Sequence, residues 1–265
     1  MSTATSNTGQ THLAYFLAAV MFYTRLPVPE SAAHSEHILN KSRIYFPVIG
    51  WIVGALAILV FWLANQVLPT SVSVLLSMIA TILVTGAFHE DGFADSCDGL
   101  GGGWQTEQVL TIMKDSRVGT YAVVGLILIL GLKLLALMEL AQHPFWLFAL
   151  IYLAAHTISR LYSSLVIEVF DYVQDIDASK VKPITDRRLE PTEIAITTCF
   201  TALPVLLLLI AWTNAVIALL SAALMAWGFA RYSAYRIGGY TGDILGAVQQ
   251  LSEVVFLVAM LALVN

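Results

Sequence analysis

The stretch "SVSVLLSMIATILVTGAFHE", residues 71–90, decides the fold class of this chain, because it carries no charge before its last two residues, His89 and Glu90. About 20 apolar residues suffice to cross the ~30 Å hydrocarbon core of a membrane as a helix. The chain of 265 residues is 58% hydrophobic and 12% charged, with a mean hydropathy of +0.79. We therefore expect a polytopic helical membrane protein.

Similar apolar windows recur along the whole chain, and together they predict seven spans. The expected spans cover about 44–67, 71–90, 118–140, 145–167, 192–212, 214–236 and 244–264. Residues 11–25 are too short for a comfortable crossing, so we expect an interfacial or re-entrant helix there. The predicted architecture is one integral membrane domain over residues 1–265, an all-α transmembrane helical bundle.

The connections between the expected spans fall into a short, nearly uncharged set and a long, charged set. The long set comprises residues 25–43, 91–117, 168–191 and 237–243. Nearly all Lys and Arg residues lie in or beside the long set, and Lys133 is the exception. Because basic loops face the cytoplasm, we expect the long set on that side. The predicted catalytic face comprises residues 25–43, 88–120, 168–191 and 236–247.

The expected span at 71–90 leads into "EDGFADSCDGLGGG", residues 90–103, which is unusually acidic for this chain. If the helix continues, Asp91, Asp95 and Asp98 fall within an arc of about 60° on one face. Unit charges about 4 Å apart near a protein surface interact at roughly 4 kcal/mol. A divalent cation that prefers oxygen ligands would offset this repulsion, and Mg²⁺ suits a half-open site completed by water and phosphate oxygens.

Basic residues occupy positions near the same predicted face. "KDSRVGTY", residues 114–121, contains Lys114 and Arg117, which are expected either to hold phosphate oxygens or to anchor the chain at the interface. Arg25 in "TRLPVP" has the same two interpretations. The preceding residues 106–114 predict a short amphipathic surface helix that Thr106 caps.

Two further features carry charge into or near the spans. "RIGGYTGDILGA", residues 236–247, predicts a glycine-rich turn followed by a helix, in which Asp243 is a metal ligand, a base or a helix cap. Arg160 lies inside a span and is expected to have a partner there. Glu253 can pair with Arg160 or Arg231, and the sequence does not decide between them.

A carboxylate-bound metal, basic side chains and glycine-rich turns on one face suit phosphoryl-type transfer. In such a reaction the metal neutralises charge on a diphosphate, basic groups hold it, and an aspartate accepts the proton of an attacking hydroxyl. In the loop 168–191, four basic residues are candidates to cover a nucleotide. They are Lys180, Lys182, Arg187 and Arg188.

The motifs "TRLPVP", "EDGFADSCDGLGGG", "KDSRVGTY" and "GGYTGDILGA", in this order and over nearly the whole chain, resemble the cobalamin synthase family. The family is also described as cobalamin-5′-phosphate synthase or adenosylcobinamide-GDP ribazoletransferase. Phe93, Ser96, Cys97 and Ala122 depart from its usual residues, and none of these departures removes a carboxylate.

The resemblance implies an Mg²⁺-dependent enzyme of the bacterial inner membrane that completes the nucleotide loop of vitamin B12. The hydroxyl of α-ribazole, or of its 5′-phosphate, attacks the diphosphate of adenosylcobinamide-GDP. GMP leaves, and adenosylcobalamin or its 5′-phosphate forms. The lipid bilayer is then a further partner, and a homo-oligomer is left open.

Site residues follow from the resemblance and the spacing together. The expected metal ligands are Glu90, Asp91, Asp95 and Asp98, and the candidate catalytic bases are Asp98 and Asp243. The expected phosphate-binding residues are Lys114, Arg117, Arg25, Gly239, Thr241 and Gly242.

Three other function classes fit the sequence less well. A CDP-alcohol phosphotransferase also has spaced aspartates, but its arginine after the alanine is replaced by Asp95, and its second half, G-x3-D-x3-D, is missing. A cation transporter would place its site near the bilayer midplane, whereas these carboxylates crowd one edge. Nucleic-acid binding is not expected, because the chain has no basic domain.

Overall fold

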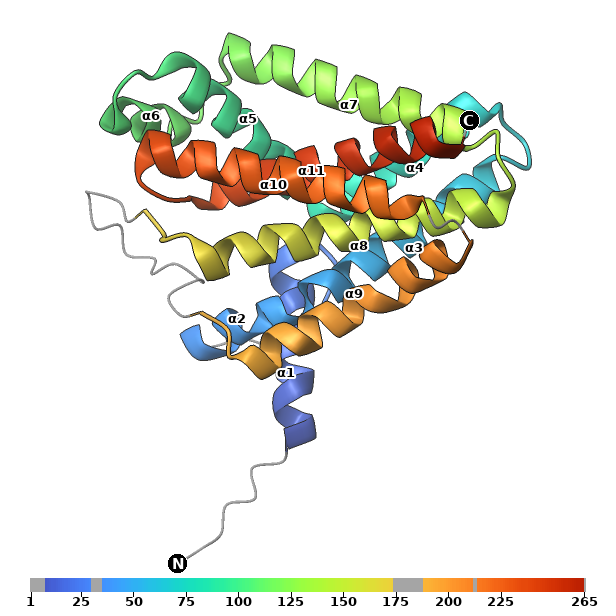
Figure 1. Cartoon of the computed structure of the whole chain (residues 1–265), viewed down its shortest axis with the longest axis horizontal. Coiled ribbons are helices and arrows are strands. Elements are labelled where there is room, and N and C mark those ends of the chain that lie inside the picture. The colour runs from blue at the N-terminus through green and yellow to red at the C-terminus, as the bar shows by residue number, and fades with distance from the viewer. Residues whose placement is uncertain (1–7, 30–34, 174–187, 212–213, 265) are drawn as a thin grey trace, which may run out of the picture.

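The computed structural model describes residues 8–29, 35–173, 188–211 and 214–264, which form an all-helical bundle (Figure 1). In these residues, one isolated β-bridge joins Tyr172 to Tyr240. The helices in chain order are α1 (Thr8–Tyr23), α2 (Glu36–Ser42), η2 (Arg43–Tyr45), α3 (Phe46–Ala64), α4 (Thr70–Thr85), α5 (Phe88–Gly102), α6 (Thr106–Met113), α7 (Thr120–Leu140), α8 (Phe145–Val169), α9 (Pro191–Ala211), α10 (Ala215–Ile237) and α11 (Gly242–Val264).

Six helical segments of the described chain are long and apolar enough to cross a membrane. They are His37–Ala64, Thr120–Leu140, Phe145–Val169, Pro191–Leu209, Ala215–Ile237 and Gly242–Val264. The pair α4 and α5 makes a seventh if it is counted as one broken span. The predicted polytopic bundle is thus confirmed. The short apolar helix α1 runs across the direction of the long helices in Figure 1, and its position relative to the bilayer stays a prediction.

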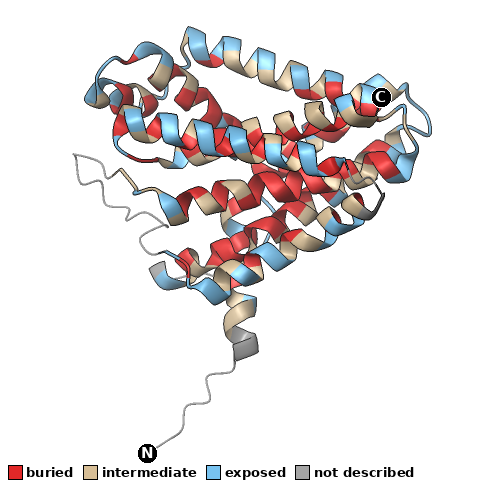
Figure 2. Ribbon diagram, in the orientation of Figure 1, coloured by how far each residue is buried: buried red, intermediate tan, exposed pale blue. Residues whose placement is uncertain are grey.

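Helices α8 and α11 form the centre of the bundle. Helix α11 packs against α10, α5, α8 and α7, and α8 packs against α3, α11 and α9. Their shared core contains large side chains such as Phe148, Tyr152 and Phe256. Figure 2 shows buried positions along these inner helices and many exposed ones along α7 and α10. Exposed apolar residues such as Leu128 and Leu224 give the outer helices the surface expected against lipid tails.

The predicted span at 71–90 is wrong in one respect, because the helix does not continue into the acidic stretch. Helix α4 ends at Thr85, and Gly86 and Ala87 both adopt left-handed backbone conformations, with φ values of 69° and 58°. Helix α5 then leaves at an angle of 88° to α4. The acidic residues nevertheless share one helix, so the expected spacing of Asp91, Asp95 and Asp98 along a helix is confirmed.

Helix α6 is amphipathic as predicted, and its apolar face packs against the protein itself. Val109, Leu110 and Met113 are buried in a cluster that also contains Ile244. The expected cap at Thr106 is wrong: Gln105 is the N-cap residue and forms a reciprocal capping box with Gln108. This packing fixes α6 beside the end of α5 and the start of α11.

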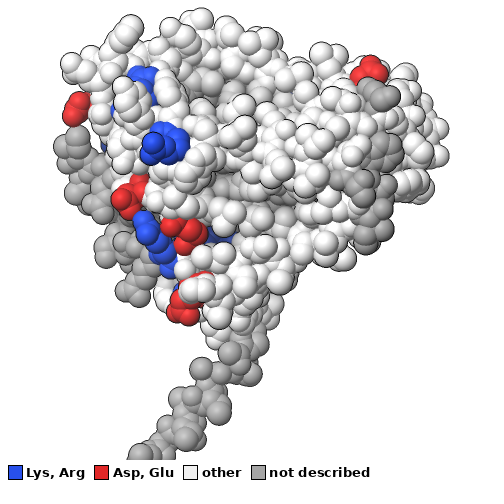
Figure 3. Space-filling model, in the orientation of Figure 1, with Lys and Arg blue, Asp and Glu red and all other residues white. Residues whose placement is uncertain are grey.

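Charged residues on the visible face gather at one end of the bundle (Figure 3), the end at which α5 and α6 lie in Figure 1. The opposite end is almost uncharged in this view. A bundle that crosses a membrane needs apolar flanks and polar ends, and here one end carries most of the visible charge. The chemistry of the chain is therefore to be sought at the end beside α5.

We predict that Gly86→Ala lowers the free energy of unfolding by about 1 kcal/mol, because a left-handed conformation disfavours a Cβ. The control is Gly228→Ala in α10, where an added Cβ would meet no atom within 4 Å. That change is expected to be neutral or stabilising by up to ~1 kcal/mol. Thermal unfolding in detergent compares the two, and equal effects would contradict the role of Gly86 in the bend.

Candidate active site

The structure brings together aspartates that the sequence places in separate motifs. Asp91 is exposed, Asp95 is partly exposed, and Asp98 is buried on α5. Asp95 is repelled most by Asp243, in the first turn of α11, and then by Asp91 and Asp98. The two helices approach closely at Gly92, where a Cβ would lie 2.9 Å from the Cα of Asp243. Asp91, Asp95 and Asp243 therefore form one acidic group between α5 and α11.

Asp98 has a different environment from the other aspartates, because it caps helix α7. Its Oδ2 accepts a hydrogen bond from the Gly119 backbone N–H at 2.6 Å, and its Oδ1 accepts one from Ala122 at 2.9 Å. The first backbone N–H groups of a helix lack partners within the helix, and a carboxylate there is also favoured by the helix dipole. Since both oxygens are engaged, Asp98 joins α5 to α7, and it is less suited than Asp243 to accept a proton.

The C-terminal end of α5 is held by Arg236, a residue for which no site role was predicted. Its guanidinium donates to the carbonyls of Leu100 (3.2 Å) and Gly103 (2.5 Å), where α5 ends. The Thr106 hydroxyl in turn donates to the Arg236 carbonyl at 3.1 Å. A cation at the negative end of a helix is stabilising, so Arg236 fixes the turn from α5 to α6.

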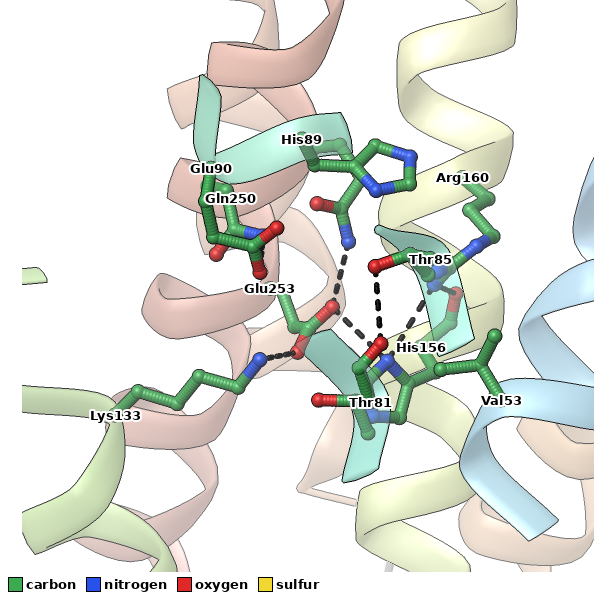
Figure 4. Close-up of a pocket in the computed structure, with 11 residues that line it drawn as sticks. Val53, Thr81, Thr85, His89, Glu90, Lys133, His156, Arg160, Gln250 and Glu253 are labelled. Atoms are coloured by element: carbon green, nitrogen blue, oxygen red, sulfur yellow. Dashed lines mark hydrogen bonds and ion pairs between the residues drawn. The ribbon is translucent and has the colours of Figure 1, made fainter. Parts of the chain in front are cut away.

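Glu90 does not join the aspartates, although the sequence grouped it with them as a metal ligand. Its Oε1 accepts a hydrogen bond from Gln250 of α11 at 3.0 Å, inside the bundle. It lines the same buried polar pocket as an ionic group in which Lys133 lies 2.5 Å and His156 3.2 Å from Glu253 (Figure 4). The prediction that Glu253 pairs with Arg160 or Arg231 is therefore wrong in the described chain, because its ion pair is with Lys133. The signal that could have found this partner is that Lys133 is the one basic residue outside the charge pattern.

Two of the three predicted phosphate-binding cations lie between α6 and α7, and the third lies beside the bend before α5. Arg117 is exposed and forms an ion pair with Asp115, and hydrogen bonds from Arg117 lower the pKa of Asp115 to about 2. Lys114 is exposed at the end of α6. Arg25 is exposed, and its backbone N–H donates to the Val84 carbonyl at 2.7 Å. All three are open to solvent near the two ends of α5.

In the turn before α11, two of the three residues predicted to bind phosphate, Gly239 and Thr241, have structural roles. A Cβ at Gly239 would overlap the carbonyl oxygen of Asp171, so this glycine permits close packing. The Thr241 hydroxyl accepts a hydrogen bond from the Ile244 backbone N–H at 3.3 Å, as a helix cap does. Gly242 is exposed, and an added Cβ would meet nothing within 4 Å. Gly242 is thus the one of the three at which a ligand has open access.

The loop that was expected to cover a nucleotide lies largely outside the described residues. Three of its four candidate residues, Lys180, Lys182 and Arg187, fall within 174–187, which the structure does not describe. Arg188 is described, and its guanidinium lies 3.2 Å from the exposed carboxylate of Asp171.

The acidic group has the donor chemistry for Mg²⁺ but not a complete set of protein ligands. In the described part of the chain, no three His, Cys, Asp or Glu side chains are arranged to hold a metal ion. Mg²⁺ is commonly bound by one or two carboxylates, with water and substrate phosphates as its other ligands. The exposed and partly exposed carboxylates of Asp91 and Asp95 fit that arrangement, whereas Asp98 and Glu90 are engaged elsewhere.

These features define a polytopic helical membrane protein with an acidic group, flanked by exposed cations, at one end of its bundle. The sequence profile of the family described as cobalamin-5-phosphate synthase matches residues 15–261. The chain belongs to this family, as the motifs predicted. No solved structure gives a significant match.

Curated relatives support the same family. A protein of Shewanella frigidimarina (strain NCIMB 400) is 44% identical over 94% of this chain and 95% of its own length. One from Leptospira interrogans is 40% identical over 91% and 92% of the two chains. One from Vibrio cholerae (El Tor Inaba N16961) is 41% identical over 94% of each. All three are named adenosylcobinamide-GDP ribazoletransferase.

We predict opposite effects on stability for two aspartates of α5. Asp98→Ala removes the cap of α7 and should lower the free energy of unfolding by about 1–2 kcal/mol. Asp95→Ala removes a carboxylate that is repelled by three others, so it should leave stability unchanged or raise it. Thermal unfolding of both variants in detergent decides the matter, and a larger loss for Asp95→Ala would overturn these assignments.

Proposed function

We propose that this chain is an adenosylcobinamide-GDP ribazoletransferase that works at the acidic group beside α5. It transfers the adenosylcobinamide-phosphate moiety to α-ribazole or its 5′-phosphate and releases GMP. The observation that supports this most directly is that Asp91, Asp95 and Asp243 gather at one end of a bundle whose family is shown. Relatives that bear this name are 40–44% identical over most of both chains.

In the proposed reaction, the ribazole hydroxyl oxygen forms a bond to the phosphorus that carries the cobinamide. The bond from that phosphorus to the bridging oxygen breaks, and GMP leaves with the electron pair. Asp243 is the favoured base for the hydroxyl proton, because it is partly exposed beside Asp95. Lys114, Arg117 and Arg25 are placed to hold phosphate oxygens, as exposed cations near the ends of α5.

We propose Asp91 and Asp95 as the residues that hold Mg²⁺. Their carboxylates are acceptors that a hard cation prefers, and the repulsion on Asp95 would be offset by a positive charge. When bound, Mg²⁺ would supply charge neutralisation to the diphosphate. Asp98 would then serve by fixing α5 against α7.

Release of GMP by purified protein in nanodiscs tests the function. Wild type, supplied with adenosylcobinamide-GDP, α-ribazole phosphate and Mg²⁺, should release GMP, and EDTA should abolish the release. Asp91→Asn and Asp95→Asn should each lower kcat at least about 100-fold, as removal of a transition-state charge contact does. Glu107→Gln, an exposed carboxylate on α6, is the control and should retain activity.

Turnover in the absence of divalent metal would contradict the proposed metal role. No turnover by well-folded wild type would contradict the function itself.

We further propose that the membrane is the bacterial inner membrane and that the end beside α5 faces the cytoplasm. The basic residues of the long connections support this orientation. Trp104, 90% exposed between α5 and α6, is a suitable position for a single reporter cysteine. Trp104→Cys in a Cys97→Ser, Cys199→Ser background should react with an impermeant maleimide in inverted vesicles and be protected in intact spheroplasts. The reverse pattern would place α5 on the outer side.

A further inference from the structure

A small polar cavity of about 10 Å³ lies inside the bundle beneath α5 (Figure 4). Its walls come from six helices, α3, α4, α5, α7, α8 and α11, and carry the side chains of Glu90, Lys133, Arg160 and Glu253. A cavity needs roughly 10–15 Å³ to hold one water molecule, which also requires two to four polar partners. The cavity therefore has room for one water and is lined by charge.

The charges around this cavity are not all paired by direct contact. Lys133 and Glu253 form an ion pair at 2.5 Å. Arg160, 1% exposed, donates from Nη1 to the His156 carbonyl at 2.8 Å, and within the described chain it has no carboxylate within 4 Å and no partner for its Nε. Glu90, 9% exposed, uses Oε1 for Gln250 and has no described partner for Oε2. Arg160 and Glu90 thus line the same cavity with opposite charges, and each has one atom, Nε and Oε2 respectively, without a hydrogen-bond partner.

Arg160 is attracted first to Glu253 and then to Glu90, although neither carboxylate touches it, and of the two Glu90 has an oxygen without a described partner that is not already in an ion pair. His89, also buried, contributes a third unused atom, its Nε2, to the same wall. Burying a charge without a partner inside a bundle is costly, and intramembrane ionisable residues almost always pair. A bridging water is enthalpically nearly as good as a direct hydrogen bond, so it can complete a pair that the side chains do not close.

We propose that this cavity is a binding site for one ordered water, which bridges Arg160 of α8 to Glu90 of α5 with His89 as a further partner. The bridge holds the start of α5 to the centre of the bundle, so Glu90 and Arg160 are positioning residues for Asp91 and Asp95. Only this catalytic consequence rests on the function proposed above; the bridge itself does not.

The chain contains its own reporter of the position of α5. Cys97 is half-buried on α5 against α7, where a Cβ at Gly125 would lie 2.7 Å from its Sγ. If α5 loosens, this thiol becomes more accessible to a small maleimide. Cys199 is exposed on α9, within a segment long and apolar enough to cross a membrane. It therefore faces lipid, and its slow rate is an internal reference that rises only if the rest of the fold opens. Mass spectrometry of the labelled peptides gives both alkylation rates in one sample.

Four variants in nanodiscs test the bridge: Glu90→Gln, Arg160→Gln, the double variant, and Arg188→Gln as a control from an exposed ion pair. Each single change should raise the alkylation rate of Cys97 at least about tenfold, because it leaves a buried charge unpaired. The double variant removes both charges and should not exceed either single variant. Arg188→Gln, and the rate at Cys199 throughout, should stay at the wild-type values.

Multiplicative effects in the double variant, or unchanged Cys97 rates in the single variants, would overturn the bridge. If a single variant does not fold, the double variant decides, since its cavity keeps only the paired Lys133 and Glu253 and folding should be restored; a double variant that also fails contradicts the proposal. GMP release is measured in parallel. If wild-type protein releases no GMP but the Cys97 rates are as expected, the proposed function is rejected and the bridge is still supported.

Discussion

The constraint on which this structure depends is the cost of charge where water is scarce. A bundle that crosses a membrane must satisfy its polar groups internally, and at its centre the described chain does so around an ionic group. Glu253 lies against Lys133 and His156, and the Gln249 amide donates to the same carboxylate at 2.6 Å. This group joins α7, α8 and α11 at the centre of the bundle, and the first residues of α5 line the same pocket.

Hydrogen bonds from three side chains position helix α5. Glu90 joins its start to α11, Asp98 joins its middle to α7, and Arg236 of α10 holds its end. Each attachment uses a side chain that sequence motifs alone would assign to chemistry or to a basic loop. Once these contacts are made, Asp91 and Asp95 are the α5 carboxylates with exposure left for a ligand. Rigid placement of a few groups is what phosphoryl-type transfer requires of a protein.

The sequence predicted the bundle and the family because both depend on signals that are local in the chain. Apolar length marks the spans, and the spacing of Asp91, Asp95 and Asp98 survives because residues 88–102 form one helix. The bend at Ala87 was missed because that residue, unlike glycine, rarely adopts a left-handed conformation. The cap made by Asp98 was missed because its partners are more than 20 residues away, at the start of another helix. Contacts of that kind follow from tertiary packing, which no spacing rule contains.

The central claim is that the open carboxylates of α5, and not the buried ones, meet the diphosphate. A cryo-EM structure of the protein in nanodiscs with adenosylcobinamide-GDP tests this most directly. The account predicts that the diphosphate lies against Asp91 and Asp95 beside the start of α11, while Asp98 keeps its bonds to α7 and Glu90 stays inside the bundle. A diphosphate bound at the opposite end of the bundle, or Asp98 and Glu90 turned outward to meet it, would contradict the account.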